Sequence, residues 1–129
     1  MKQCVLIIAS IYGMLSVILG ALGAHAFKQI LPAEKLLSFE TGVRYQMYHA
    51  IALLAIGFFL SFSTSVEKWA AICIILGVFL FSFSIYFLSF ADYWNVNLRF
   101  LGPVTPIGGL FMIAGWLLLI IYFIKYKTI

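Results

Sequence analysis

Four long apolar runs, nearly free of charge, constrain the fold of this chain more than any other feature of its sequence. They cover residues 4–26, 43–62, 69–90 and 104–124. Each is close to the ~20 residues with which an α-helix crosses about 30 Å of bilayer hydrocarbon. Charged residues make up 9% of the chain, against about a quarter in soluble domains. The sequence therefore predicts an all-α fold, an integral membrane four-helix bundle that forms one domain over residues 1–129.

Two alternatives to this topology are weaker. An outer-membrane β-barrel would show short segments of alternating apolar and polar residues, whereas these runs are apolar on every face. A cleaved secretory signal would explain Lys2 ahead of the first run and the small residues Ala24 and Ala26 near its end. The apolar stretch 4–22 is, however, longer than the roughly 7 to 15 residues of a signal core. We therefore expect the first run to remain as a membrane helix.

Cysteine and charge patterns argue against several classes of function. Cys4 and Cys73 lie inside apolar runs and form no closely spaced cluster, so the sequence predicts neither a disulfide framework nor a zinc site. The net charge of +4 is spread over loops and termini, without the dense basic stripe that nucleic-acid binding needs. No nucleophile with its base, flanking carboxylate pair or metal-ligand spacing is visible in the sequence. We therefore expect no enzyme activity, no cofactor, no metal and no nucleic-acid partner.

The connections between the runs predict how the helices follow one another. Pro32 precedes a stretch, 33–39, that could form a short interfacial helix ahead of the second run. The Ser/Thr-rich turn at 61–65 is short enough to make the second and third helices antiparallel neighbours. Thr105 before Pro106 is typical of an N-cap followed by proline at the first helical position. We therefore expect the fourth helix to begin there.

Small residues recur on the first and fourth runs at helical spacing. Ser16, Gly20 and Ala24 lie four apart, and Gly108 and Gly115 lie seven apart. Such stripes let helix backbones approach closely in lipid, where no hydrophobic force drives helices together. They favour packing within the bundle, with homodimer formation as the alternative. Because no internal repeat is visible, an inverted-repeat transporter has no support.

One end of the predicted bundle gathers nearly all of the unusual polar residues. In a four-span topology, the C-ends of the first and third helices and the N-ends of the second and fourth lie on the same side of the membrane. Within the second helix, Glu40 and Arg44 are one turn apart and can form an ion pair. The candidate ligand-binding residues on this side are His25, Arg44, Tyr45, Gln46, Tyr48, His49, Arg99 and Thr105.

Two interpretations of this cluster stay open. Arg44 could extend its head to the interface while a hydroxyl or carbonyl of the first or fourth helix satisfies His49. Alternatively, Arg44 and Arg99, together with the partial positive charge of two helix N-termini, could bind an anion. A lipid phosphate or the carboxylate of an amphiphile would fit such a site. His49 lies roughly 9 Å beyond Val43 along the helix, a depth at which ionisable groups usually face the interior or a wet cavity.

Three motifs, placed in order along the chain, carry a resemblance to a known family. They are LGALGAH at 19–25, VRYQMYHA at 43–50 and GPVTPIGG at 102–109, followed by Gly115-Trp116. Over nearly the whole chain, the sequence resembles the small four-span membrane family of unknown function that includes the bacterial YgdD and YwdK type and small eukaryotic transmembrane relatives. The resemblance implies four spans and transfers no established activity. The motif positions of the family correspond here to His25, Arg44, Tyr45, Gln46, His49, Pro103, Thr105 and Pro106.

The predicted function is binding or structural support in a membrane, with a polar site that holds an anionic lipid or amphiphile. One alternative is an accessory subunit of a larger membrane complex. A less favoured alternative is a small oligomeric transporter or proton-coupled carrier built around His25 and His49. The expected partners are membrane lipids, together with a larger membrane complex or further copies of this chain.

The expected location is a bacterial inner membrane, with the termini in the cytoplasm. A simple count of basic residues does not decide the orientation. If packing within the bundle fixes Arg44 and Arg99, however, these two no longer act as topological signals. The terminal side then carries the larger number of basic residues, which places that side in the cytoplasm. The count sets Lys2, Lys68, Lys125 and Lys127 on the terminal side against Lys28, Lys35, Arg44 and Arg99 on the other.

Overall fold

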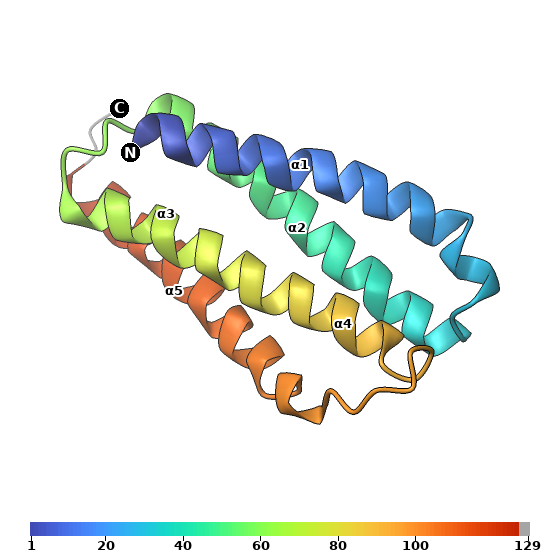
Figure 1. Ribbon diagram of the computed structural model, residues 1–129. Coiled ribbons are helices and arrows are strands. Elements are labelled where there is room, and N and C mark those ends of the chain that lie inside the picture. The colour runs from blue at the N-terminus through green and yellow to red at the C-terminus, as the bar shows by residue number, and fades with distance from the viewer. Residues whose placement is uncertain (127–129) are drawn as a thin grey trace.

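A computed structural model describes residues 1–126, which form four helical rods and no strand (Figure 1). The first, second and fourth rods are α1 (Lys2–Ala24), α2 (Ala33–Phe59) and α5 (Val104–Lys125). The third rod joins α3 (Ser65–Val78), the π-helix η2 (Phe79–Phe83) and α4 (Ser84–Phe90). Two 3-10 turns, η1 (Phe27–Gln29) and η3 (Arg99–Leu101), lie in the first and third connections. The predicted all-α, four-helix architecture is confirmed.

Hydropathy separates α2 from the other three rods. By length and composition, the segments Lys2–Ala24, Ser65–Phe90 and Arg99–Lys125 are able to cross a membrane. Among residues 1–126, α2 does not reach the same hydropathy, because Arg44, Gln46 and His49 interrupt its apolar sequence. It is nevertheless 27 residues long and lies alongside α1 (Figure 1). The polar side chains within the bundle are therefore concentrated on α2, and the helices that pack against α2 supply hydrogen-bond partners for them.

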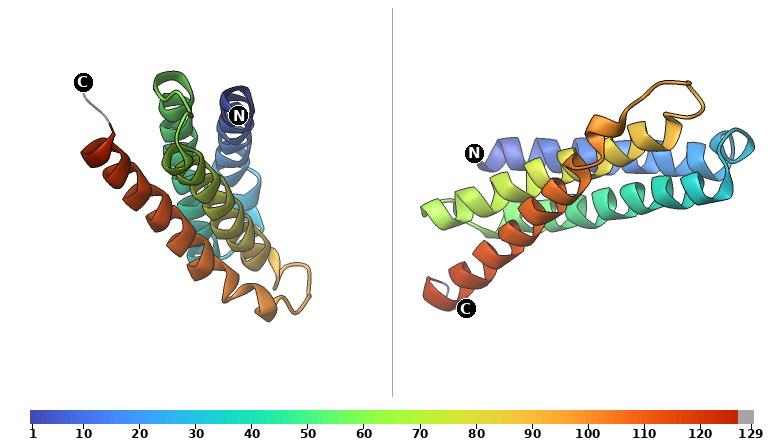
Figure 2. Two further views of the ribbon diagram at one scale, coloured as in Figure 1. Left: turned by 90° about the vertical axis from the view of Figure 1, so that its left-hand side faces the viewer. Right: turned by 90° about the horizontal axis from the view of Figure 1, so that it is seen from below.

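The rods pack as two antiparallel pairs, α1 with α2 and the third rod with α5. The second and third rods are antiparallel, as their short connection predicts, and they meet through α3, η2 and α4. Figure 2 shows α5 crossing the other rods obliquely, so that the C-terminal end of α5 stands apart from α2. The apolar core between the rods includes Val5, Leu53, Ile74, Val78 and Met112.

Glycines set the distance between α3 and α5. A Cβ atom on Gly108 would stand 2.8 Å from the carbonyl oxygen of Gly77, and a Cβ atom on Gly77 would stand 2.9 Å from that of Gly108. These positions therefore admit no side chain unless the two helices move apart. On α1, Gly20 makes an ordinary close contact with α2, since its Cβ would lie 3.5 Å from Val43. Gly20 and Gly108 thus serve packing within the chain, as predicted, whereas Ala24, the third residue of the predicted stripe on α1, is exposed.

The beginnings of α2 and α5 differ from the sequence prediction. Pro32 is the N-cap of α2, so the expected interfacial helix at 33–39 is the first part of α2 and not a separate element. Pro103 precedes α5 with φ −69° and ψ −20°, and this helical backbone starts the helix before Thr105. The prediction of Thr105 as an N-cap is therefore wrong, because Thr105 lies inside the helix, one residue after its start at Val104, whereas an N-cap residue flanks the helix.

Candidate functional site

Gln46 lies inside the bundle and bridges three rods. Its side chain is fully buried, with 0% exposure. The amide nitrogen donates to the carbonyl oxygen of Tyr12 on α1 at 2.9 Å, and the amide oxygen accepts from the Tyr86 hydroxyl on α4 at 2.6 Å. The Tyr12 hydroxyl donates in turn to the carbonyl oxygen of Ile75 on α3 at 2.8 Å. Because polar groups in lipid need partners from the protein, this bridge holds the two helix pairs together.

His49 is also buried, and both of its ring nitrogens are engaged. The indole nitrogen of Trp116 on α5 donates to Nε2 of His49 at 3.0 Å. Since an indole nitrogen can only donate, the imidazole carries its proton on Nδ1, which donates to the carbonyl oxygen of Tyr45 at 2.7 Å. The imidazole is therefore neutral. The partners of His49 are an indole on α5 and a carbonyl of its own helix, and not the hydroxyl or carbonyl of the first or fourth helix that one of the two interpretations expected.

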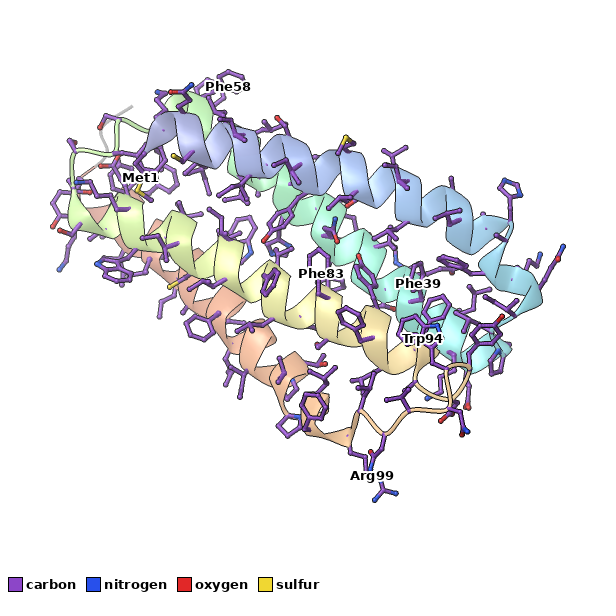
Figure 3. All side chains as sticks on the ribbon, viewed as in Figure 1. Met1, Phe39, Phe58, Phe83, Trp94 and Arg99 are labelled. Atoms are coloured by element: carbon purple, nitrogen blue, oxygen red, sulfur yellow. The ribbon has the colours of Figure 1, made fainter. Side chains whose placement is uncertain are left out.

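The other predicted site residues do not form one cluster. Arg44 is exposed, and its Nη2 atom donates to the Thr41 hydroxyl at 3.2 Å, not to Glu40. Within residues 1–126, the one ion pair is Lys35 with Asp92, at 3.9 Å. The predicted Glu40–Arg44 ion pair is therefore wrong. The remaining exposed residues of the predicted site are His25, Tyr45, Tyr48 and Arg99, and Figure 3 shows Arg99 pointing away from the bundle.

His25, Arg44, His49 and Thr105, which the sequence places at one end of the bundle, do not converge on one point. These four residues share no hydrogen bond among the described residues. The reason is helical phase, because Arg44 and His49 are five positions apart on the helix and their side chains therefore point about 140° apart. His49 consequently faces α5 while Arg44 faces outward. Residue order along the chain places both at one end of the bundle, but it does not aim them at one another.

An open cavity of about 480 Å³ lies at the polar end, between α2, α4 and the start of α5. Lys35, Ser38 and Thr41 line it from α2, and Ser89 lines it from α4. Thr105 lines it from α5, and the Thr105 hydroxyl lies 2.6 Å from the Ser84 hydroxyl. The rest of the lining includes Ile85, Leu88, Gly102 and Pro106. The cavity therefore combines one ammonium and four hydroxyls with an apolar surface.

A second open crevice, of about 790 Å³, adjoins this cavity under the connection that follows α4. Lys35 and Leu88 line both spaces. The side chain of Lys35 is 33% exposed, and that of its partner Asp92 is 84% exposed. The further polar residues that line the crevice are Asp92, Asn95, Asn97 and Arg99. Lys35 is therefore the cation that stands between the two spaces.

Sequence reasoning missed Lys35, Ser38 and Thr41 as site residues. They are three residues apart and lie along one side of α2, a spacing that is visible in the sequence. The spacing was not recognised because the stretch 33–39 was expected to be a separate short helix and the second span to begin at residue 43, so these three positions were not placed on one continuous helix. Pro32, a good helix-starting residue, was the available indication that the helix begins earlier.

The terminal end of the bundle holds a second polar assembly that sequence reasoning missed. Glu67 is fully buried, and its carboxylate accepts from the backbone nitrogens of Ser61, Phe62 and Thr64 at 2.8 to 3.1 Å. The Thr64 hydroxyl donates to the same carboxylate at 2.9 Å and accepts from the backbone nitrogen of Glu67, which completes a capping box. The signal was the Thr-x-x-Glu spacing ahead of an apolar run.

This assembly also holds an unusual backbone conformation and a lysine. Phe62 has a φ of 56°, which is uncommon for a residue with a Cβ atom. The Lys2 ammonium donates to the carbonyl oxygens of Phe58 and Leu60, at 3.2 and 3.0 Å, and thereby closes the end of α2. The carboxylate of Glu67 is therefore engaged by the turn that follows α2, whereas the ammonium of Lys2 uses two of its three hydrogens there.

Comparison with known proteins gives a family. Residues 19–109 match the family described as "Protein of unknown function (DUF423)". The chain is similar to a UPF0382 membrane protein of Staphylococcus haemolyticus, with 42% identity over 94% of this chain and 95% of that protein. It is also similar to the UPF0382 inner membrane protein YgdD of Escherichia coli strain K12, with 35% identity over 98% of this chain and 93% of that protein. No solved structure matches.

Proposed function

We propose that this chain, a multi-pass membrane protein that belongs to the DUF423 family of unknown function, holds an anionic lipid or other anionic amphiphile at the polar end of its bundle. The observation that carries the proposal is the cavity between α2, α4 and α5, where the Lys35 ammonium and the hydroxyls of Ser38, Thr41, Ser89 and Thr105 surround an apolar surface. An amphiphile has the matching chemistry, because its anionic head needs a cation while its chain needs apolar contacts. The hydroxyls of Thr41 and Ser89 donate to carbonyl oxygens of their own helices, so the Lys35 ammonium is the group that attracts the anion.

Lys35 is available to such a ligand. Its ion pair with Asp92 is long, at 3.9 Å, and the carboxylate side is largely exposed. Exposed pairs of this kind contribute at most about 1 kcal/mol, so a phosphate or carboxylate can displace Asp92 at small cost. The α5 N-terminus adds partial positive charge and free backbone donors beside the cavity. Lys35 and this helix N-terminus are therefore the groups beside the cavity that favour a negative headgroup.

Arg44 remains part of the proposed site, in a supporting role. Its guanidinium contacts Thr41, which lines the cavity, so a headgroup at Lys35 has a second cation on the same helix. A guanidinium can grip two oxygens of one phosphate, which a lysine cannot do. Gln46 and His49 stand apart, since their polar atoms serve the bundle. The proposed role is binding and not catalysis.

The test is retention of phosphatidylglycerol by the full-length protein, measured by native mass spectrometry from mild detergent with phosphatidylcholine as the neutral comparison. We expect Lys35→Ala to weaken phosphatidylglycerol binding about tenfold, as the loss of one charge-assisted contact implies. Arg44→Ala should weaken it by about threefold, and Arg44→Lys by less, because lysine keeps the charge without the fork. Lys28→Ala, an exposed lysine outside the cavity, is the matched control.

The proposal fails if all four variants retain phosphatidylglycerol as the unsubstituted protein does. It also fails if phosphatidylcholine binds equally well and loses affinity in the same variants, because the cavity would then select an apolar chain and not a negative headgroup. A loss in Arg44→Ala without a loss in Lys35→Ala would move the anion away from the cavity and reject this site.

A further inference from the structure

An apolar groove of about 230 Å³ lies between α2 and α5 in the terminal half of the bundle, away from the cavity of the proposed function. It exists because α5 crosses the bundle obliquely and moves away from α2 towards its C-terminal end (Figure 2). The hydrogen bond from Trp116 to His49 is the last polar tie between the two helices before they separate in the described chain. The residues that line the groove are Ala52, Ala55, Ile56, Phe59, Leu60, Trp116, Leu119 and Phe123.

We propose that this groove binds one acyl chain of an anionic phospholipid from the leaflet on the terminal side, with the headgroup held by the basic residues at that end. This inference is independent of the proposed function, because the groove and the Lys35 cavity share no residue and lie at opposite ends of the bundle.

The lining of the groove fits an acyl chain. The small side chains of Ala52 and Ala55 leave the space open towards the C-terminal end of α2, and all of the lining residues are apolar. An acyl chain is thin and unbranched, so it can lie along such a space between two helices.

The charge at the mouth of the groove selects the headgroup. Leu60 lines the groove, and its carbonyl oxygen accepts the Lys2 ammonium at 3.0 Å. Lys125 is exposed on the last turn of α5, just beyond Phe123 in the lining. The one acidic residue at this end, Glu67, is buried with its carboxylate fully engaged. The described surface here is therefore positive, whereas the other acidic residues of the chain, Glu34, Glu40 and Asp92, lie at the opposite end.

Trp116 provides the experiment, because its indole is fixed by His49 at the groove. With Trp69→Phe and Trp94→Phe, the full-length protein keeps Trp116 as its single tryptophan. It is reconstituted into vesicles of phosphatidylcholine that contain a small fraction of phosphatidylglycerol, with bromine on the chains of one lipid or the other. We expect brominated phosphatidylglycerol to quench Trp116 with a relative affinity about fivefold above that of brominated phosphatidylcholine, the equivalent of one lysine held near an anionic surface.

Two sets of variants separate the chain site from the headgroup site. Ala55→Phe fills the groove from an exposed position and should abolish the preference, while Ala21→Phe, which puts the same ring on an exposed position of α1, should not. Lys2→Gln with Lys125→Gln should bring the two lipids to equal quenching and leave the quenching by phosphatidylcholine unchanged. Lys35→Ala should have no effect, which keeps this test distinct from that of the proposed function.

Three outcomes would overturn the inference. Equal quenching by the two lipids in the protein with an unsubstituted groove would show that the site does not select an anionic headgroup. A preference that survives Ala55→Phe would place the lipid elsewhere. Protection of Trp116 from both lipids, together with cross-linking between two copies through Ala55→Cys, would assign the groove to a side chain of a second copy of the chain.

Discussion

The two ends of the bundle carry similar polar residues and use them in opposite ways. At the terminal end, the Glu67 carboxylate and the Lys2 ammonium bind backbone atoms of the turn after α2, and the carboxylate is buried. At the other end, the cations of Lys35 and Arg44 have weak or local partners, and an open cavity lies beside them. The comparison teaches that a binding site is located by polar atoms that remain free for a ligand, and not by the number of polar residues.

The middle of the bundle resembles the terminal end in this respect. Gln46 and His49 are buried, and their polar atoms are matched by Tyr12, Tyr86 and Trp116. Deep in the membrane no water can replace a missing partner, so these residues belong to the support of the fold. Near the headgroups water and lipid supply partners, which allows Lys35 and Arg44 to stay free.

The largest expected effect tests the closed terminal end. Glu67→Ala leaves the backbone nitrogens of Ser61, Phe62 and Thr64 without their acceptor, and we expect it to lower the free energy of unfolding by about 3 kcal/mol. The measurement is unfolding by dodecyl sulfate in mixed micelles, followed by far-ultraviolet circular dichroism. Glu34→Ala, an exposed acidic residue at the open end, is the matched control and should change the value by less than about 0.5 kcal/mol. Equal effects of the two substitutions would contradict the difference between the terminal end and the open end of the bundle.

A smaller effect is expected from the middle of the bundle. Gln46→Met keeps the length of the side chain but removes both hydrogen bonds, so we expect a loss of about 1 kcal/mol in the same unfolding assay. Tyr86→Phe removes one of these two bonds and should cost no more, and the double variant should cost little more than Gln46→Met alone, because the bond between Tyr86 and Gln46 is already lost there. Strict additivity of the two substitutions would show that the bridge between the helix pairs does not act as one unit.

Lys2 should contribute less than the buried groups, because its ammonium is partly exposed. We expect Lys2→Met to lower the free energy of unfolding by about 0.5 to 1 kcal/mol, since it leaves the carbonyl oxygens of Phe58 and Leu60 at the end of α2 without a charged donor. Lys68→Met, at a neighbouring exposed position, serves as the control. A loss in the control as large as that in Lys2→Met would point to a general effect of charge at this end.

The smallest effect on stability is expected at the open end. Lys35→Ala removes one long, exposed ion pair, so the free energy of unfolding in lipid-free detergent should change by less than about 0.5 kcal/mol. The same variant should lose the stabilisation that added phosphatidylglycerol gives to the unsubstituted protein, because a ligand stabilises only the state that binds it. A large loss of stability without lipid would place Lys35 with the structural groups and erase the difference between the two ends.

Most of the architecture could be predicted from the sequence, because length and hydropathy act on whole segments. The apolar runs correspond to the four rods, and the small residues such as Gly108 mark a close helix contact. The family could also be identified from short motifs in the sequence, and the match of residues 19–109 to the family confirms it. These predictions succeed because they need only the order of residues along the chain.

From the sequence, the site could be located at one end of the bundle but not more closely. Whether Arg44 and His49 meet depends on helical phase and on which helices lie beside α2, and neither follows from four-span topology. Lys35 was missed because the first residue of α2 was misplaced. The orientation of the protein in its membrane stays a prediction, and its premise is weakened, because Arg44 and Arg99 are exposed and not held by the bundle.

The pairing of neighbouring rods bears on how a ribosome delivers this protein to its membrane. Because α1 packs on α2 and the third rod packs on α5, each tight pair is a hairpin of consecutive segments. The first hairpin can close while the second is still being synthesised. The hydrogen bond from the Tyr86 hydroxyl to the Gln46 amide forms only when the second hairpin packs against the first. Assembly thus needs one late event, the docking of two preformed hairpins, in keeping with the general tendency of larger chains to fold in units as they emerge.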